Sequence, residues 1–149
     1  MSRLYDALVL DMDGVVVDTE PILFTTFCRL FEPFGISFPD AYLHRLVGDS
    51  TRQNLVDIAR DYAVTFDAAA MEEALHEAHR QALERVFIPL RVGITRLLDQ
   101  AREAGLQIGL CTSSQASMVD ILMQRIGFSQ GLTQPLQNYF SVMVTGDRV

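Results

Sequence analysis

The feature that most constrains the fold is a short apolar run that stops at two closely spaced carboxylates. Residues 6–10 end in Val9 and Leu10, and Asp11-Met12-Asp13-Gly14 follows at once. A run of this length, closed by a turn sequence, predicts a buried strand and then a sharp turn at Gly14. Both carboxylates would then stand at the carboxyl end of a strand, where open α/β sheets place their ligands.

After this turn the apolar residues take up helical spacing. Pro21 suits the first turn of a helix, Ser50 or Thr51 can cap a second one, and Asp67 can cap a third. The segment from about Pro21 to Phe87 is therefore predicted to be helical throughout.

Beyond this helical block, apolar strands and helices alternate. The predicted elements are a helix over 94–101 ended by Gly105, a strand over 106–111, a helix over 119–126 closed by Gly127, and a strand over 141–145. Alternation of this kind indicates a parallel α/β sheet. The expected fold class is therefore α/β, with a Rossmann-like core of about three strands (residues 1–17 and 89–149) and an inserted α-helical domain (residues 18–88).

Composition limits the classes of partner that the chain is expected to bind. The net charge of −7 disfavours nucleic acid, whose binding depends on basic side chains, and favours a small-molecule partner. No apolar run is long enough to cross a membrane, and the first residues do not resemble a secretory signal, so a cytoplasmic protein is expected. Cys28 and Cys111 lack the spacing of a zinc or redox motif and are expected to be buried thiols.

The spacing of Asp11 and Asp13 suits phosphoryl transfer. If both side chains face one crevice, one carboxylate can attack phosphorus while the other donates a proton to the leaving oxygen. A divalent cation would be needed between the carboxylate and the phosphate, and oxygen ligands suit Mg²⁺. Thr112 follows the second strand and precedes a helix, and such a hydroxyl beside helix N–H groups can either hold a phosphate or cap the helix.

Two alternatives compete for the two aspartates. A calcium loop that starts at Asp11 would need glycine at its sixth position and glutamate at its twelfth, where this chain has Val16 and Ile22. The other alternative is that Asp11 and Asp13 only shape a strand-to-helix turn. A turn needs one such residue, so the pair favours a site.

The two motifs together resemble one family. Residues 8–20 are similar to the first motif of the haloacid dehalogenase superfamily, in the subgroup of β-phosphoglucomutase and sugar-phosphate phosphatases, and residues 109–114 resemble its second motif. The resemblance implies that Asp11 is the nucleophile and a Mg²⁺ ligand. It implies that Asp13 is the general acid/base and binds the metal through its backbone carbonyl, that Thr112 and Ser113 hold the phosphoryl group, and that the helical block is a cap.

A loop of the helical block resembles the family loop that reaches over the substrate. It contains Gly48, Ser50 and Arg52, and Arg52 is either a substrate contact or an exposed residue in the first turn of a helix. His76 and His79 on a later helix are better explained by a solvated helix face than by a metal site.

Two departures from the family pattern qualify the function. Leu23 stands where mutases carry a histidine, which favours a phosphatase acting on a small phosphomonoester such as a sugar phosphate. All 12 basic residues are arginine, so the lysine of the family's third motif is absent, and the chain is expected to be shorter than the working enzyme and weakly active. A phosphohexomutase and a non-catalytic fragment or assembly module remain as alternatives, and self-association through an unpaired sheet edge is expected.

Overall fold

The computed structural model describes residues 4–126 and 130–147, and it divides into two compact units. The sheet unit comprises the chain up to Thr19 together with the chain from Val86, and the helical unit comprises Glu20–Arg85. No helix of the described residues is long and apolar enough to cross a membrane. The assignment of residues 18–88 as a cap over a catalytic core stays a prediction.

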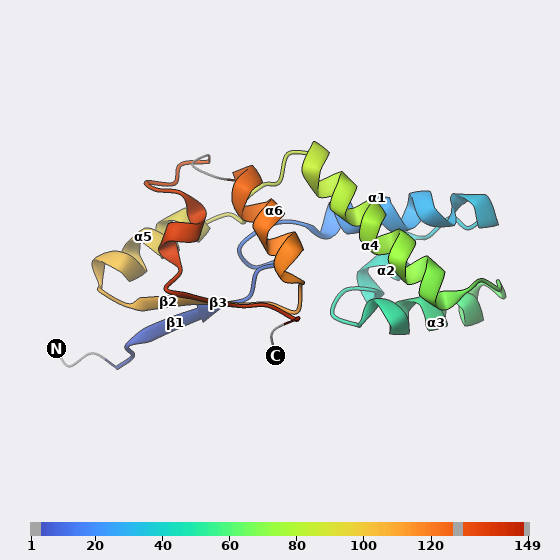
Figure 1. Ribbon diagram of the computed structural model, residues 1–149, viewed down its shortest axis with the longest axis horizontal. Helices are drawn as coiled ribbons and strands as arrows, with labels where there is room; N and C mark the ends of the chain where they lie inside the picture. The colour runs from blue at the N-terminus through green and yellow to red at the C-terminus, as the bar shows by residue number, and fades with distance from the viewer. Residues whose placement is uncertain (1–3, 127–129, 148–149) are drawn as a thin grey trace. The chain divides into compact units, whose positions relative to one another are not determined.

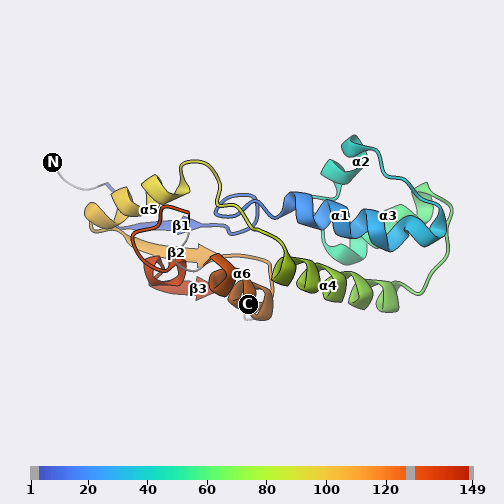
Figure 2. The same cartoon turned by 90° about the horizontal axis from the view of Figure 1, so that it is seen from above.

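The sheet unit contains a parallel sheet with the strand order β1-β2-β3 (Figure 1). Its elements are β1 (Ala7–Leu10), α5 (Ile94–Glu103), β2 (Gln107–Cys111), α6 (Ala116–Ile126), the 3₁₀ helix η2 (Leu136–Tyr139) and β3 (Val142–Val144). All three strand arrows point the same way (Figure 2). The expected α/β class with a three-stranded parallel sheet is confirmed. Gly127, the predicted end of α6, lies outside the described residues.

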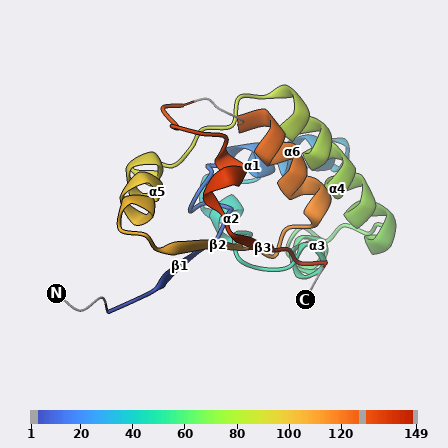
Figure 3. The same cartoon turned by 60° about the vertical axis from the view of Figure 1, so that its left-hand side comes forward.

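Both helices that connect the strands lie on one face of this sheet. The order β1-β2-β3 steps in one direction, and right-handed crossovers in one direction place α5 and α6 on the same side (Figure 3). Leu10, Ile108 and Leu110 face these helices and are buried. On the opposite face Val9 is 65% exposed and Val142 is 55% exposed. Within the described residues this second face is therefore largely uncovered.

The two connections to the helical insertion are bonded to each other within the sheet unit. The Asp18 N–H donates to the Pro89 carbonyl at 2.9 Å, and the Arg91 N–H donates to the Val16 carbonyl at 3.0 Å. An ion pair of 3.2 Å joins the Arg91 guanidinium to the Asp18 carboxylate. The chain therefore leaves and re-enters the sheet unit along two adjacent antiparallel segments.

The segment before β3, to which the sequence assigns no role, makes structural contacts. The Gln130 side chain accepts a hydrogen bond from the Leu90 N–H and donates one to the Ile88 carbonyl, each at 2.7 Å. The Tyr139 hydroxyl donates to Asp99 of α5 at 2.7 Å. This segment therefore holds the returning connection and α5 in place.

The helical unit is built from four α-helices and a 3₁₀ turn among the described residues. They are α1 (Glu20–Phe31), η1 (Glu32–Phe34), α2 (Asp40–Arg45), α3 (Thr51–Asp61) and α4 (Ala68–Arg85). The Ser50 hydroxyl accepts from the Gln53 N–H, and the Asp67 carboxylate accepts from the first N–H groups of α4, so both predicted caps are confirmed. The segment is not helical throughout, because loops separate the helices and α2 has only 6 residues.

Aromatic rings fill much of the helical unit's core. Phe31 is fully buried, and its ring lies 5.5 Å from that of Phe38 and 5.6 Å from that of Phe66. Edge-to-face pairs of this kind add to the gain from burying the rings. Tyr42 extends the cluster, with its ring 5.2 Å from that of Tyr62.

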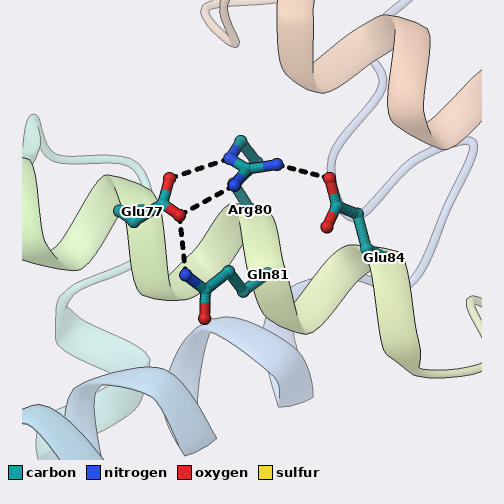
Figure 4. Close-up of polar contacts among 4 residues, drawn as sticks. All are labelled: Glu77, Arg80, Gln81 and Glu84. Carbon is teal, nitrogen blue, oxygen red and sulfur yellow. Dashed lines mark hydrogen bonds and ion pairs between the residues drawn. The ribbon is translucent and has the colours of Figure 1, made fainter.

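The exposed side of α4 carries a polar network. Figure 4 shows the Arg80 guanidinium bonded to both Glu77 and Glu84, with Gln81 donating to Glu77. The hydrogen bonds from Arg80 and Gln81 lower the pKa of Glu77 to about 2. His76, on the same helix, is exposed. The exposed His76 agrees with a solvated helix face, whereas His79 on the same helix is half-buried.

Replacing Tyr42 should make the protein less sensitive to alkali. Burial and the hydrogen bond to Asp61 raise the pKa of Tyr42 from 10.0 to about 12. The neutral phenol is thus favoured by the fold, and its contribution is present below pH 10.0 and lost as the pH rises through about 12. We expect the melting temperature of Tyr42→Phe to fall less steeply over this range than that of the wild type. Tyr5→Phe, at an exposed tyrosine of the sheet unit, is the control and should follow the wild type.

Candidate active site

The turn after β1 is organised around one carbonyl group. Met12 is completely buried, and its carbonyl oxygen accepts from the N–H groups of Val15, Val16 and Val17. Gly14 has a φ of +72°, which a residue with a side chain rarely adopts, and its N–H donates to the Val17 carbonyl at 2.8 Å. The predicted sharp turn at Gly14 is confirmed, and it fixes the backbone on both sides of Asp13.

Asp13 points to hydroxyl groups from two segments of the sheet unit. Its Oδ1 accepts from the Thr19 hydroxyl at 2.7 Å, and its Oδ2 accepts from the Ser114 hydroxyl at 2.7 Å. The Thr112 hydroxyl lies 3.5 Å from the same Oδ2. The structure therefore brings Asp13 and the predicted phosphate-binding loop together, although 99 residues separate Asp13 from Thr112.

Asp11 is exposed, in contrast to its neighbour. Its Oδ1 accepts from the Met12 N–H at 2.7 Å, which orients the carboxylate. It directly follows Leu10, which pairs with Leu110 in the parallel register. Asp11 thus stands beside the end of β2, at the carboxyl edge of the sheet, where open α/β sheets place their ligands.

The loop after β2 is a tight turn. Thr112 is 5% exposed, and its hydroxyl oxygen accepts from the Ser114 N–H at 3.1 Å. Its own N–H donates to the Val144 carbonyl of β3 at 3.0 Å. Ser113 is exposed at the tip. Hydroxyl and amide donors are therefore gathered in front of α6, as a phosphate site requires.

Sequence reasoning missed three residues of this region. Thr19 and Ser114 supply the hydroxyls that bind Asp13, and Asp147 accepts a hydrogen bond from the Ala116 N–H, the first N–H of α6, at 2.9 Å. Ser114 is the last residue of the second motif (residues 109–114), so its position in the sequence signals a role. Thr19 lies only six residues from Asp13. The bond of Asp147 carries no local signal, because it joins segments 31 residues apart.

The loop of the helical unit contains the three predicted substrate contacts, Gly48, Ser50 and Arg52. Gly48 is exposed with a φ of +93°. Ser50 caps α3, and the Arg52 guanidinium pairs with Glu72 of α4 at 3.7 Å, with 75% of the Arg52 side chain exposed. Arg52 thus has the geometry of an exposed first-turn residue. A substrate contact by Gly48, Ser50 or Arg52 stays a prediction.

Asp11 and Asp13 suit Mg²⁺ in the chemistry of their donors. Asp11 offers carboxylate oxygens and Asp13 its backbone carbonyl oxygen, and proteins often bind Mg²⁺ through one or two carboxylates plus substrate phosphate. Among residues 4–126 and 130–147, no group of three or more acidic, histidine or cysteine side chains is placed to hold a metal ion. These two residues could therefore supply only part of a coordination shell.

Comparison with known proteins identifies the family. The sequence matches the haloacid dehalogenase-like hydrolases over residues 8–149. The chain belongs to this family. The match covers both strand-end motifs of the candidate site, as well as the helical unit between them.

Relatives within the family include sugar-phosphate enzymes. The chain is 27% identical over 147 residues to a phosphorylated carbohydrates phosphatase from Thermotoga maritima, covering 97% of this chain and 62% of that protein. It is 31% identical over 115 residues to a β-phosphoglucomutase from Bacillus subtilis, covering 73% of this chain and 51% of that protein. The expected resemblance to this subgroup is confirmed, and the chain spans less than two thirds of these relatives' lengths.

A solved structure shares the fold. The chain matches CbbY from Rhodobacter sphaeroides, crystallised in complex with xylulose-(1,5)bisphosphate, with a TM-score of 0.72 and 23% identity. The match covers 98% of this chain and 65% of that one. At this identity the similarity shows the fold.

Thr19→Val should destabilise the protein through Asp13. Thr19 is 4% exposed, and valine would keep its shape while leaving Asp13 Oδ1 without its hydroxyl donor. We expect the free energy of unfolding, measured by urea denaturation, to fall by about 1–3 kcal/mol. Thr25→Val is the control, because the Thr25 hydroxyl bonds an exposed backbone carbonyl and its loss should cost less than about 0.5 kcal/mol. Equal losses for the two variants would contradict the importance of the Asp13 contact.

Proposed function

We propose that the protein is a phosphatase that acts on a small phosphomonoester through an aspartyl phosphate on Asp11. The observation that carries this proposal is the pairing of β1 with β2, which places Asp11 and Asp13 beside the loop that starts at Thr112. A carboxylate nucleophile, a second carboxylate and a phosphate-binding loop at one sheet edge are the parts that this reaction needs.

The reaction would proceed in two displacements. An Asp11 oxygen attacks phosphorus, the bond from phosphorus to the ester oxygen breaks, and Asp13 in its protonated form gives that oxygen a proton. Asp13 then takes a proton from water, whose oxygen attacks phosphorus and releases Asp11 and inorganic phosphate. Hydrogen bonds to both oxygens of Asp13 hold its carboxylate in one orientation for these proton transfers.

The donors of the loop after β2 would bind the phosphoryl group. The Thr112 hydroxyl and the Ser113 N–H are the groups we assign to this role. Asp11 and Asp13 would hold Mg²⁺, which, when bound, reduces the repulsion between carboxylate and phosphate. In the helical unit, Gly48, Ser50 and Arg52 are candidates for contact with the rest of the substrate, and Arg52 suits an anionic or hydroxylated one.

A sugar phosphate is the proposed substrate class, because the relatives include a phosphorylated carbohydrates phosphatase. The similarity to a β-phosphoglucomutase keeps a phosphohexomutase as the second candidate. Leu23 argues against it, because this side chain packs against the helical unit's apolar core and offers no base. Transfer to water is therefore favoured over transfer to a sugar hydroxyl.

Trapping should place a phosphate mimic on Asp11. With beryllium fluoride and Mg²⁺, we expect NMR signals of the 113–116 amides to shift in the wild type and not in Asp11→Asn. Turnover of sugar phosphates and p-nitrophenyl phosphate should be weak, because the chain has no lysine to offset the phosphate charge. Any turnover should vanish in Asp11→Asn and fall about 10²–10⁴-fold in Asp13→Asn. A mimic that binds equally well to Asp11→Asn would rule out this nucleophile.

We also propose self-association through β1. Within the described residues β1 pairs only with β2, so its other edge presents backbone N–H and C=O groups next to the exposed Val9. Such an edge can pair with a second copy of the chain. The net charge of −7 opposes this contact at low salt.

Val9→Lys should weaken the self-association. A lysine on an exposed edge strand disfavours edge-to-edge pairing. In sedimentation velocity experiments, the sedimentation coefficient of the wild type should increase with protein concentration, and more so at high salt. That of Val9→Lys should not increase. Val56→Lys, at an exposed valine of α3, is the control and should behave as the wild type. A wild type that stays monomeric at high concentration would exclude this interface.

A further inference from the structure

The turn after β3 presses against the loop after β2. The Gly146 N–H donates to the Ser114 carbonyl at 2.9 Å. A Cβ atom at Gly146 would lie 2.1 Å from the Ser113 carbonyl oxygen, a separation that no side chain permits. Only glycine allows the two backbones to lie this close, so the backbone of Gly146 packs directly against the tip of the loop.

Asp147 adds a second contact between the same segments. Its Oδ1 accepts from the Ala116 N–H at 2.9 Å and from the Thr145 hydroxyl at 2.7 Å. Thr145 is 4% exposed, so the hydroxyl that orients the carboxylate is itself held in place. A carboxylate at the first N–H of a helix is a charge-assisted cap. The cap of α6 therefore comes from 31 residues further along the chain.

These contacts leave the amide at the loop tip available. The Ser114 N–H is bonded to the Thr112 hydroxyl, and the Ala116 N–H is bonded to Asp147. For the Ser113 N–H, the described part of the chain provides no acceptor. The Ser113 N–H, a donor that the proposed phosphate site needs, is thus not used by the loop's own contacts.

We propose that Gly146 and Asp147 are positioning residues, which hold the loop of residues 112–114 in the shape that presents the Ser113 N–H and the Thr112 hydroxyl to a phosphoryl group. This inference rests on the proposed function. It gives the turn after β3 a role in binding, although neither residue contacts the phosphate.

Because Asp147 is charged, the positioning role and a simple charge effect predict opposite changes in phosphate affinity when Asp147 is replaced. A carboxylate near a phosphate site repels the ligand, so its removal alone would strengthen phosphate binding. Loss of the contact to Ala116 would weaken binding, because the loop would lose its shape. Asparagine removes the charge but keeps an oxygen acceptor, whereas alanine removes both.

The experiment compares Asp147→Ala, Asp147→Asn and the control Asp67→Ala, which removes a similar carboxylate cap from α4. Inorganic phosphate is titrated in the presence of Mg²⁺ and followed by the amide NMR signals of residues 113–116. We expect Asp147→Ala to weaken phosphate binding by about tenfold and Asp147→Asn to stay within about twofold of the wild type. Asp67→Ala should lower the melting temperature without changing phosphate affinity.

Amide hydrogen exchange separates this inference from the proposed function. Exchange at Ala116 should be faster in Asp147→Ala than in Asp147→Asn, whether or not phosphate binds. A wild type that binds no phosphate would contradict the proposed function, and the exchange data would still report on the loop. Unchanged or tighter phosphate binding by Asp147→Ala, or exchange at Ala116 equal to that of the wild type, would overturn the positioning role.

Discussion

In the parallel pairing of β1 with β2, Leu10 lies beside Leu110, and this register determines where the residues of the candidate site stand. Both leucines are buried on the face that α5 and α6 cover. A slip by one residue would turn Leu10 to the uncovered face and bring Val9 inward, so burial strongly favours the observed register. The polar residues that follow the two strands then meet at one edge.

The turn after β1 orients Asp13 at this edge, and the backbone that follows it accommodates a large insertion. The Met12 carbonyl binds three N–H groups and directs Asp13 toward Ser114. A few residues later, the backbone bonds of Asp18 and Arg91 close the two ends of the insertion. Because these ends are adjacent, inserting Glu20–Arg85 adds little to the entropy of loop closure, which grows slowly with length. The helical unit can therefore fold on its own core without disturbing the strand ends.

The sequence predicts what is local. Short apolar runs bounded by turn residues located β1 and β2. Capping preferences located Ser50 and Asp67, because a cap acts on N–H groups within one helical turn. The contacts of Ser114 and Asp147 could not be predicted in this way. Asp147 caps a helix that begins 31 residues earlier, and Ser114 bonds a carboxylate 101 residues away. Such bonds exist only once the strand order and register are set, and the sequence carries no periodic signal for them.

The described residues around Asp13 supply hydrogen-bond donors but no positive charge. Around Asp13 the partners are neutral hydroxyls, from Thr19 and Ser114. Hydroxyls orient a carboxylate but leave its charge in place, and Asp11 adds a second negative charge at the same sheet edge. A phosphoryl group approaching this edge is therefore attracted by amides and hydroxyls and repelled by two carboxylates. The side chains that bind Asp13 supply no positive charge to offset this repulsion. This is the physical reason why the proposed function includes a divalent cation.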